Sequence, residues 1–204
     1  MRLKTRRNTP VWFIAVLPIL SILVAFILGA FFIIWAGESP ITAYIALING
    51  ALGSTFAITE SLTRAIPLIF TGLAAAVAFR AKFWNIGAEG QFVMGGIAGS
   101  AVGLYFYNVE AFWLLPLMTI AGILGGMFYA GIAAFLRIKY QVNEILVTLM
   151  LTYVAVLFLS AMLQGPLRNP SGFNFPESRI FHDSAMLPII WEGTRLHIGL
   201  IVAI

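Results

Sequence analysis

The chain has no cysteine and few charged residues: only 10% of its 204 residues are Asp, Glu, Lys or Arg. The missing cysteines exclude disulfide bonds and thiolate metal sites. Hydrophobic residues make up 61% of the chain, and its mean hydropathy is +0.97. Soluble domains are about 45–50% apolar and about 25% charged. A chain with so few polar groups cannot cover its own surface in water, so the composition indicates a membrane protein.

Sequence signatures of catalysis are missing as well. The chain contains no Walker A loop, no Gly-x-Ser-x-Gly elbow and no His-Glu-x-x-His pattern. Its two histidines, His182 and His197, belong to no such motif. The 12 Lys and Arg residues are scattered, so the net charge of +4 does not indicate a nucleic-acid surface. We therefore predict that the chain is not an enzyme, holds no metal, and depends on another chain for any binding of ATP.

Long apolar runs separated by charged residues predict membrane-spanning helices. The first run, Val11–Ala36, would be roughly 39 Å long at about 1.5 Å per residue, which exceeds the ~30 Å hydrocarbon core. The basic start MRLKTRR resembles a signal peptide, but the run is longer than the roughly 7–15 apolar residues of such a segment. The predicted spans are about residues 11–36, 62–79, 85–107, 111–136 and 145–163, with a cut-off span from residue 198.

The last run of the chain is too short to be a span by itself. Crossing a bilayer takes about 20 residues, whereas Ile198–Ile204 has seven. We therefore expect a C-terminally truncated protein, in which a single transmembrane domain over residues 1–204 is the N-terminal part of a larger one. A long polar stretch, Gln164–His197, precedes this last run.

The segment after the first span reads as an amphipathic helix. Ser39 suits the N-cap position and Pro40 the first helical residue. The pattern predicts a helix that lies at the membrane interface or enters it shallowly. Its apolar face consists of Ile41, Tyr44, Ile45, Ile48 and Leu52.

The distribution of basic residues predicts which end of each span faces the cytoplasm. Loops on the cytoplasmic side carry an excess of Lys and Arg. If the N-terminus is cytoplasmic, that side holds eight basic residues and the other side holds four, Arg64, Arg168, Arg179 and Arg195. The eight are Arg2, Lys4, Arg6, Arg7, Arg80, Lys82, Arg137 and Lys139. We therefore predict a cytoplasmic N-terminus.

Small residues recur at four-residue spacing within the predicted spans. Helices in lipid pack through close backbone approach at small residues, because burial against one another adds little hydrophobic free energy. The pattern predicts a compact helical bundle, and generic helix packing accounts for it more simply than a dedicated dimer face. The positions concerned are Gly95, Gly99 and Gly103 in the third span and Gly122 and Gly126 in the fourth.

Two polar segments interrupt the apolar pattern at the predicted cytoplasmic ends of spans. The first contains Asn85, Gly87, Glu89, Gly90 and Gln91, and the second contains Asn143 and Glu144. One interpretation is helix capping, since Asn suits the N-cap and an acid in the first turn favours the helix dipole. A second is a broken-helix site at which Glu89 faces a polar pathway, with the glycines loosening the backbone. A third is a contact surface for a cytoplasmic partner.

These segments resemble the permeases of ATP-binding-cassette (ABC) importers in the branched-chain amino acid, ribose and nucleoside superfamily, with the nucleoside and simple-sugar branch nearest. Asn85-Ile86-Gly87-Ala88-Glu89-Gly90-Gln91 is the most specific part. The family favours Gly where this chain has Lys82 and Gln141, and Asn where it has Thr152. Further matching residues are Pro67-Leu68-Ile69, Gly72-Leu73, Phe79-Arg80-Ala81, Asn143-Glu144 and Thr148-Leu149-Met150-Leu151.

The resemblance implies an all-α, polytopic transmembrane bundle of the type II-like importer class. Such a subunit performs no chemistry, and ATP and Mg are bound by partner ATPase subunits in the cytoplasm. The other implied partners are a second permease subunit and an extracytoplasmic solute-binding lipoprotein. The implied location is the cytoplasmic membrane of a bacterium or archaeon, and the implied solute is a nucleoside or simple sugar. The loop that docks on the ATPase is expected after residue 204.

Two other classes of membrane protein remain open at this point. An ion-coupled secondary transporter would use an intramembrane carboxylate such as Glu89 as an ion or proton site. A non-transporting membrane scaffold would need neither Glu89 nor the glycines beside it. The small number of intramembrane charges favours a neutral polar solute over an ion.

Overall fold

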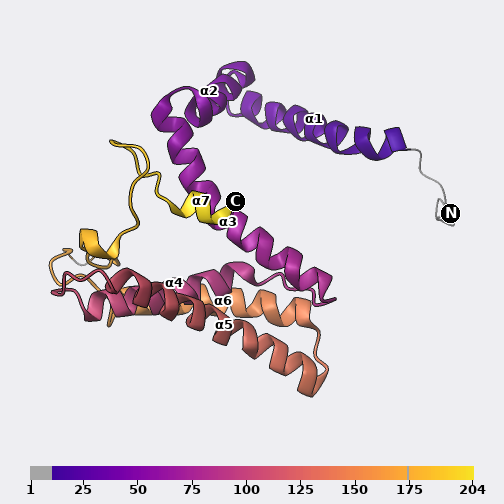
Figure 1. Ribbon diagram of the computed structural model, residues 1–204. Coiled ribbons are helices and arrows are strands. Elements are labelled where there is room, and N and C mark those ends of the chain that lie inside the picture. Colours follow the sequence, from indigo (N-terminus) through magenta and orange to yellow (C-terminus); the bar gives the residue numbers. More distant parts are fainter. Residues whose placement is uncertain (1–10, 174) are drawn as a thin grey trace. The chain divides into compact units, whose positions relative to one another are not determined.

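The computed structural model describes residues 11–173 and 175–204, and the described residues form helices joined by turns, with one long irregular segment between α6 and α7 (Figure 1). This confirms the predicted all-α class. The basic residues Arg2, Lys4, Arg6 and Arg7, which contribute to the orientation prediction, lie outside the described residues. The elements are α1 (Val11–Trp35), α2 (Pro40–Leu52), α3 (Thr55–Arg80), α4 (Ala88–Tyr105), α5 (Leu114–Tyr140), α6 (Glu144–Gln164), η1 (Asp183–Ala185) and α7 (Gly199–Ala203).

The chain divides into two compact units, Met1–Ile58 and Thr59–Ile204. In the first unit, α2 begins at Pro40 after the N-cap residue Ser39, as predicted. The hydroxyl of Tyr44 in α2 donates a hydrogen bond to the carbonyl oxygen of Phe26 in α1. The two aromatic rings also meet edge to face, with their centroids 5.1 Å apart. One tyrosine therefore joins these two helices by both a polar and an aromatic contact.

Four helices are long and apolar enough to cross a membrane, over Val16–Trp35, Thr55–Arg80, Leu114–Tyr140 and Glu144–Gln164. Helix α4 is not among them. Its 18 residues would extend about 27 Å, and its first turns contain Glu89 and Gln91. The crossing predicted over residues 85–107 therefore stays a prediction.

The helix bounds differ from the predicted spans at several places. Helix α5 lies three to four residues further along the chain than the predicted 111–136, and α4 ends two residues before 107. Contacts of side chains bear on two of the helix starts. Helix α3 begins at Thr55, although its span was expected from residue 62. Two charged residues near this start, Glu60 and Arg64, pair with each other one turn apart, with Arg64 Nε 3.4 Å from Glu60 Oε1. Helix α4 begins at Ala88, because side-chain hydrogen bonds hold Asn85 to Gly87 outside the helix.

The second unit is organised around α4, which packs against both α5 and α6 (Figure 1). Glycines bring α4 and α5 together. A Cβ atom placed on Gly95 would stand 2.8 Å from the carbonyl oxygen of Gly122, and one on Gly99 would stand 3.0 Å from that of Met118. From the α5 side, a Cβ on Gly126 would stand 3.2 Å from the carbonyl oxygen of Gln91. These separations require residues without side chains on both helices.

The end of the α4 glycine row meets side chains instead of backbone. A Cβ on Gly103 would stand 2.7 Å from the methyl carbon of Met118 and 2.9 Å from the ring of Phe181. Phe181 belongs to the long segment between α6 and α7. The row therefore serves contacts within this chain along its whole length.

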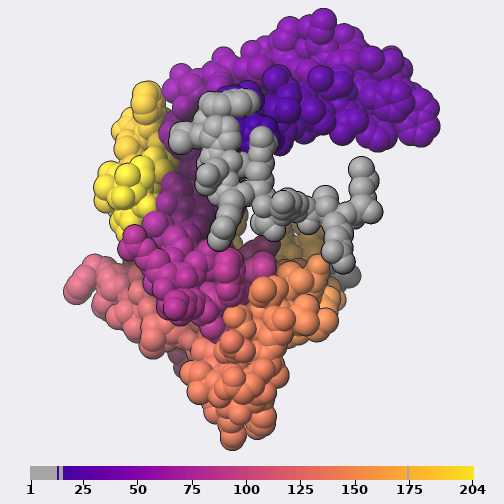
Figure 2. All heavy atoms as spheres, turned by 90° about the vertical axis from the view of Figure 1, so that its right-hand side faces the viewer, coloured from indigo at the N-terminus to yellow at the C-terminus, as the bar shows by residue number. Residues whose placement is uncertain are grey.

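Helix α6 is joined to α5 by a polar contact and leaves its outer face open. The hydroxyl of Tyr129 donates a 2.6 Å hydrogen bond to the carbonyl oxygen of Leu151. Large apolar side chains one turn apart on α6 are 59% to 70% exposed, and Figure 2 shows α6 (orange) uncovered on the viewer's side. Such a stripe suits contact with lipid. It consists of Leu146, Met150, Tyr153 and Leu157.

Two connections turn through the left-handed backbone region. Lys82 after α3 has φ of 57°, and Gln141 after α5 has φ of 54°. Only glycine adopts this region without a steric cost from its Cβ. This explains why glycine suits the corresponding positions of the resembling family.

The glycine contacts predict a position-specific effect on stability. Replacing Gly95 by Ala should lower the stability of the purified protein by about 1–3 kcal/mol, because the new methyl group would overlap the Gly122 carbonyl. Gly96→Ala is the matched control, since a Cβ there meets nothing within 4 Å. Thermal unfolding in detergent should show a lower midpoint for Gly95→Ala and an unchanged or higher one for Gly96→Ala. Equal midpoints would contradict this packing.

Candidate functional site

The polar segment between α3 and α4 is held by a reciprocal pair of side-chain amides. Asn85 Nδ2 donates to Gln91 Oε1 over 3.1 Å, and Gln91 Nε2 donates to Asn85 Oδ1 over 3.2 Å. Asn85 Oδ1 also accepts the backbone N–H of Gly87 at 3.0 Å. Only 6% of Asn85 is exposed. Its amide therefore has nearby partners for both its donor and its acceptor, which stabilises the irregular backbone before α4.

The same segment is bonded to α6 through a buried threonine. The backbone N–H of Ile86 donates to Thr148 Oγ1 over 3.2 Å. Thr148 is 1% exposed, and its hydroxyl donates to the carbonyl oxygen of Glu144 over 2.8 Å. One hydroxyl thus accepts from the α3–α4 connection and donates to the first turn of α6. The two polar segments identified in the sequence are joined here.

Gly87 and Gly90 allow this close approach to α6. A Cβ on Gly87 would stand 2.5 Å from the carbonyl oxygen of Thr148. A Cβ on Gly90 would stand 2.7 Å from the Cα of Thr152. The φ of Gly87 is −94°, which other residues adopt readily. The structure therefore gives these glycines a role in backbone contact, which the sequence interpretation of a loosened helix did not include.

Asn143 and Glu144 form the other half of the network. Asn143 is the N-cap of α6, and its Oδ1 accepts the backbone N–H groups of Ile145 and Leu146 at 2.9 and 3.4 Å. The Glu144 side chain is 10% exposed and its Oε2 is 3.1 Å from Arg137 Nε at the end of α5. Both residues thus stabilise the α5–α6 turn, in the geometry of the capping interpretation.

Glu89 stands apart from this network. It is exposed in the first turn of α4 and lines a cleft of about 650 Å³ between α3 and α4. Its carboxylate has no hydrogen bond or ion pair with any residue in the described part of the chain. The other two acids of α3–α6 are paired, Glu60 with Arg64 and Arg195 and Glu144 with Arg137.

The cleft beside Glu89 is mainly apolar, with a few polar groups. Two phenylalanine rings, Phe79 and Phe92, contribute to its walls. The Thr71 hydroxyl donates to the carbonyl oxygen of Pro67 within α3 over 2.9 Å, so its lone pairs are available as acceptors. The full lining consists of Pro67, Leu68, Thr71, Gly72, Ala75, Phe79, Asn85, Ile86, Ala88, Glu89, Phe92 and Val93.

Within the described ranges 11–173 and 175–204, no group of three or more His, Cys, Asp or Glu could hold a metal ion. A cleft with aromatic walls, an unpaired carboxylate and a threonine hydroxyl can accept hydrogen bonds from the donors of a small polar molecule.

Comparison with known proteins identifies the family. The family described as "Branched-chain amino acid transport system / permease component" matches residues 57–204. The chain belongs to this family. A glucose ABC transporter permease protein of Haloferax volcanii is 39% identical over 100% of this chain and 56% of its own length. No solved structure matches the chain.

Two further relatives carry nucleoside names. A guanosine ABC transporter permease protein of Bacillus subtilis is 32% identical over 92% of this chain and 54% of its own length. A nucleoside ABC transporter permease protein of Lactococcus lactis subsp. cremoris is 31% identical over 92% of this chain and 53% of its own length. The chain therefore spans about half the length of the curated relatives it matches. Family membership and the apolar helices together make it a multi-pass membrane protein.

Thr148 is the residue of this network that sequence reasoning did not select as a site. It was noted as part of the resemblance, four residues after Glu144, but its partner Ile86 lies 62 residues away. A threonine in a helix normally returns its hydroxyl to a carbonyl of the preceding turn, and this bond uses only the hydroxyl hydrogen. The lone pairs of Thr148 Oγ1 therefore remain free to accept, and the backbone N–H of Ile86 donates to this oxygen.

The network predicts that Thr148→Val destabilises the permease. Valine keeps the shape but leaves the Ile86 N–H without its acceptor, which should cost about 1–3 kcal/mol. Thr152→Val is the matched control, because its hydroxyl makes only the local bond to the Thr148 carbonyl. Thermal unfolding of both purified variants in detergent measures the difference. A loss no larger for Thr148→Val than for Thr152→Val would exclude the bridging role.

Proposed function

We propose that this chain forms the membrane-spanning permease subunit of an ATP-driven importer that carries a nucleoside or simple sugar across the cytoplasmic membrane of a bacterium or archaeon. The observation that carries the proposal is the match to a glucose permease over the entire chain, together with two permeases named for nucleosides. Sugars and nucleosides share a neutral, hydroxyl-bearing sugar ring. The relative named for glucose and the two named for nucleosides therefore support one chemical class of solute.

The proposed subunit has no catalytic role. Two cytoplasmic ATPase subunits bind ATP and Mg and drive the change between outward and inward access. A second permease subunit completes the pathway, and an extracytoplasmic binding protein delivers the solute. The family of ABC transporter permeases supports this division of labour.

The α3–α4 cleft is the part of this chain best suited to contact the solute. Glu89 and Thr71 offer acceptors for hydroxyl groups, and Phe79 and Phe92 offer flat apolar walls. The small number of charged residues in the apolar helices suits a neutral polar solute better than an ion. We assign Glu89 a role in binding, with Asn85 and Gln91 fixing the backbone that presents it.

The proposed orientation places the N-terminus in the cytoplasm. The chain has no cysteine over residues 1–204, so single cysteines can be introduced without removing native ones there. A membrane-impermeant thiol reagent applied from outside the cell should label Ser171→Cys and leave Lys139→Cys unlabelled. The reverse labelling pattern would show that the N-terminus lies on the opposite side of the membrane, outside the cytoplasm.

Uptake by the reconstituted system tests the function itself. The complete permease, assembled with its ATPase and binding protein in proteoliposomes, should accumulate radiolabelled glucose or guanosine only when ATP is supplied to the ATPase side. Uptake driven by an ion gradient without ATP would favour the secondary transporter, and no uptake of any sugar or nucleoside would reject the proposed solute class.

Glu89 gives a sharper test of the cleft. Glu89→Gln should lower ATP-driven uptake by more than about tenfold, equivalent to more than about 1.4 kcal/mol, at matched expression and assembly. A carboxylate that acted only on the helix dipole would contribute about 0.3–1 kcal/mol, mostly to stability. Glu192→Gln, which changes an exposed loop acid, controls for the loss of one charge. Normal uptake by the Glu89→Gln variant would show that Glu89 acts at the start of the helix and not in solute binding.

A further inference from the structure

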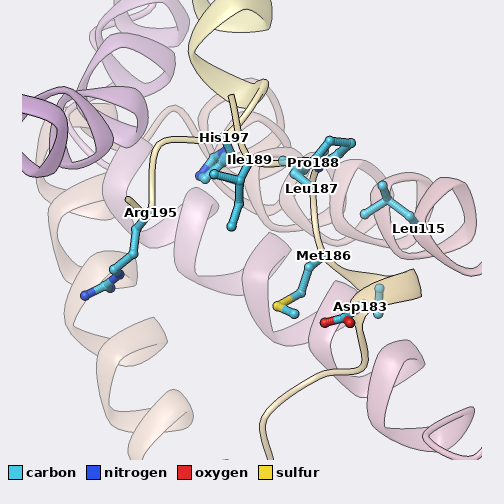
Figure 3. A pocket seen from close by; sticks show the side chains of 9 residues that line it. Leu115, Asp183, Met186, Leu187, Pro188, Ile189, Arg195 and His197 are labelled. Atoms are coloured by element: carbon cyan, nitrogen blue, oxygen red, sulfur yellow. The ribbon is translucent and has the colours of Figure 1, made fainter. Parts of the chain in front are cut away.

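A second hollow of the chain, of about 680 Å³, lies beside the segment before α7, and its polar side chains do not converge (Figure 3). In Figure 3, Arg195 lies apart from Asp183, and its guanidinium is paired with Glu60 at 3.6 Å. The run Ala185–Trp191 beside this hollow has no charged residue, although the sequence predicted a polar stretch over residues 164–197. The α3–α4 cleft, with its unpaired carboxylate, is therefore the hollow in which solute contacts can be analysed further.

The chain leaves α3, beside this cleft, through a turn that backbone hydrogen bonds define. The N–H of Lys82 donates to the carbonyl oxygen of Phe79 over 3.0 Å. The N–H of Phe83 donates to the carbonyl oxygen of Ala78, also over 3.0 Å. With Lys82 in the left-handed region, at φ of 57°, these two bonds form a Schellman motif. The motif defines the direction of the residues that follow α3.

Trp84 follows this turn and packs back against the last turn of α3. The ring centroids of Trp84 and Phe79 are 5.1 Å apart, and the ring planes meet at 44°. This separation is within the range of favourable aromatic pairs, about 4.5–7 Å. The next residue, Asn85, is 6% exposed and is bonded through its amide to Gln91. The backbone of Trp84 is therefore held on both sides, so its ring can support Phe79.

Phe79 lines the α3–α4 cleft, whereas Trp84 lies outside this lining. Phe79 is 43% exposed. A partly exposed side chain keeps several rotamers open unless a neighbour excludes some of them. The indole ring is such a neighbour, because it occupies space that the Phe79 ring would otherwise enter. Trp84 thus acts on the cleft through Phe79.

The Phe79 ring gives the cleft a flat apolar wall on its α3 side, and Glu89 contributes a carboxylate from α4. An aromatic ring stacks on a nucleobase, and it also packs on the apolar C–H face of a sugar ring. Such a contact fixes the plane of the solute. The position of the Phe79 ring therefore decides which hydroxyl groups of the solute can reach Glu89.

We propose that Trp84 is a positioning residue for solute binding, which holds the Phe79 ring in the wall of the cleft so that this ring stacks on the flat face of the solute. The inference rests on the proposed function of the α3–α4 cleft. It adds a residue that does not touch the solute itself.

Uptake by ring variants tests this role. The complete permease, assembled with its ATPase and binding protein in proteoliposomes, is compared with Trp84→Leu and Trp84→Phe at matched amounts of assembled complex. Trp84→Leu should lower ATP-driven uptake of glucose or guanosine, whichever the wild type accumulates, by about three- to tenfold, as expected for loss of an aromatic pair. Trp84→Phe should keep most of the uptake, because it keeps a ring beside Phe79.

A matched control removes an aromatic pair elsewhere. Trp113 and Phe106 have ring centroids 5.3 Å apart and lie outside the cleft lining. Trp113→Leu should therefore leave uptake near the wild-type level. If the wild type accumulates both solutes, a loss confined to guanosine assigns the stacking to the nucleobase, and an equal loss for glucose assigns it to the sugar ring.

A double-variant cycle separates positioning from a structural role. If Trp84 acts through Phe79, Trp84→Leu added to Phe79→Leu should lower uptake no further than Phe79→Leu alone. ATP hydrolysis by the complex without solute should stay at the wild-type rate in all these variants, because the cleft is then empty.

Three outcomes would overturn the inference while leaving the importer intact. Normal uptake by Trp84→Leu would show that Phe79 needs no support. Additive losses in the double variant, or an equal loss of solute-free ATP hydrolysis, would show that Trp84 supports the fold or the membrane interface, where exposed tryptophans are common. Absence of ATP-driven uptake in the wild type would instead reject the proposed function, and the inference with it.

Discussion

The structure of the second unit depends on how closely the backbone of α4 approaches its neighbours. Glycines at Gly95 and Gly99 set α4 against α5, and glycines at Gly87 and Gly90 set its beginning against α6. In lipid, such contacts replace the hydrophobic burial that drives packing in water. Close approach also brings the α3–α4 connection within hydrogen-bond distance of Thr148. The polar network and the position of Glu89 both follow from this packing.

The polar groups of the bundle follow a consistent rule of pairing. The buried amide of Asn85 is bonded to Gln91, the buried carboxylate of Glu144 to Arg137, and the buried hydroxyl of Thr148 to two backbone groups. Polar groups removed from water are costly when they lack partners. Glu89 departs from this rule because it faces a cleft, where water or a ligand can solvate it. Its unpaired state is therefore the observation that separates it from the structural residues nearby.

The sequence was sufficient to predict the class of fold and the local caps. Apolar run length predicted the helices, and Ser39 with Pro40 and Asn143 with Glu144 predicted two helix starts, because these signals act within a few residues. The start of α4 was harder to predict. The sequence of Asn85 to Gly87 does not by itself exclude a helix. The hydrogen bonds of the Asn85 side chain to Gln91 and Gly87 hold these residues outside α4. The Ile86–Thr148 bond joins residues 62 positions apart, which no local pattern specifies.

The Thr148 bridge has a mechanical consequence. It fixes the beginning of α4 to the first turn of α6, while Tyr129 and the Arg137–Glu144 pair fix α6 to α5. These three helices are thus joined to one another by contacts at several levels. Helix α3 is attached to α4 through the connection that carries Lys82 and lies across the cleft from Glu89. A rearrangement that changes the width of the cleft while keeping these bonds must move α3 relative to α4, so the hinge of such a movement is the short stretch between Arg80 and Asn85.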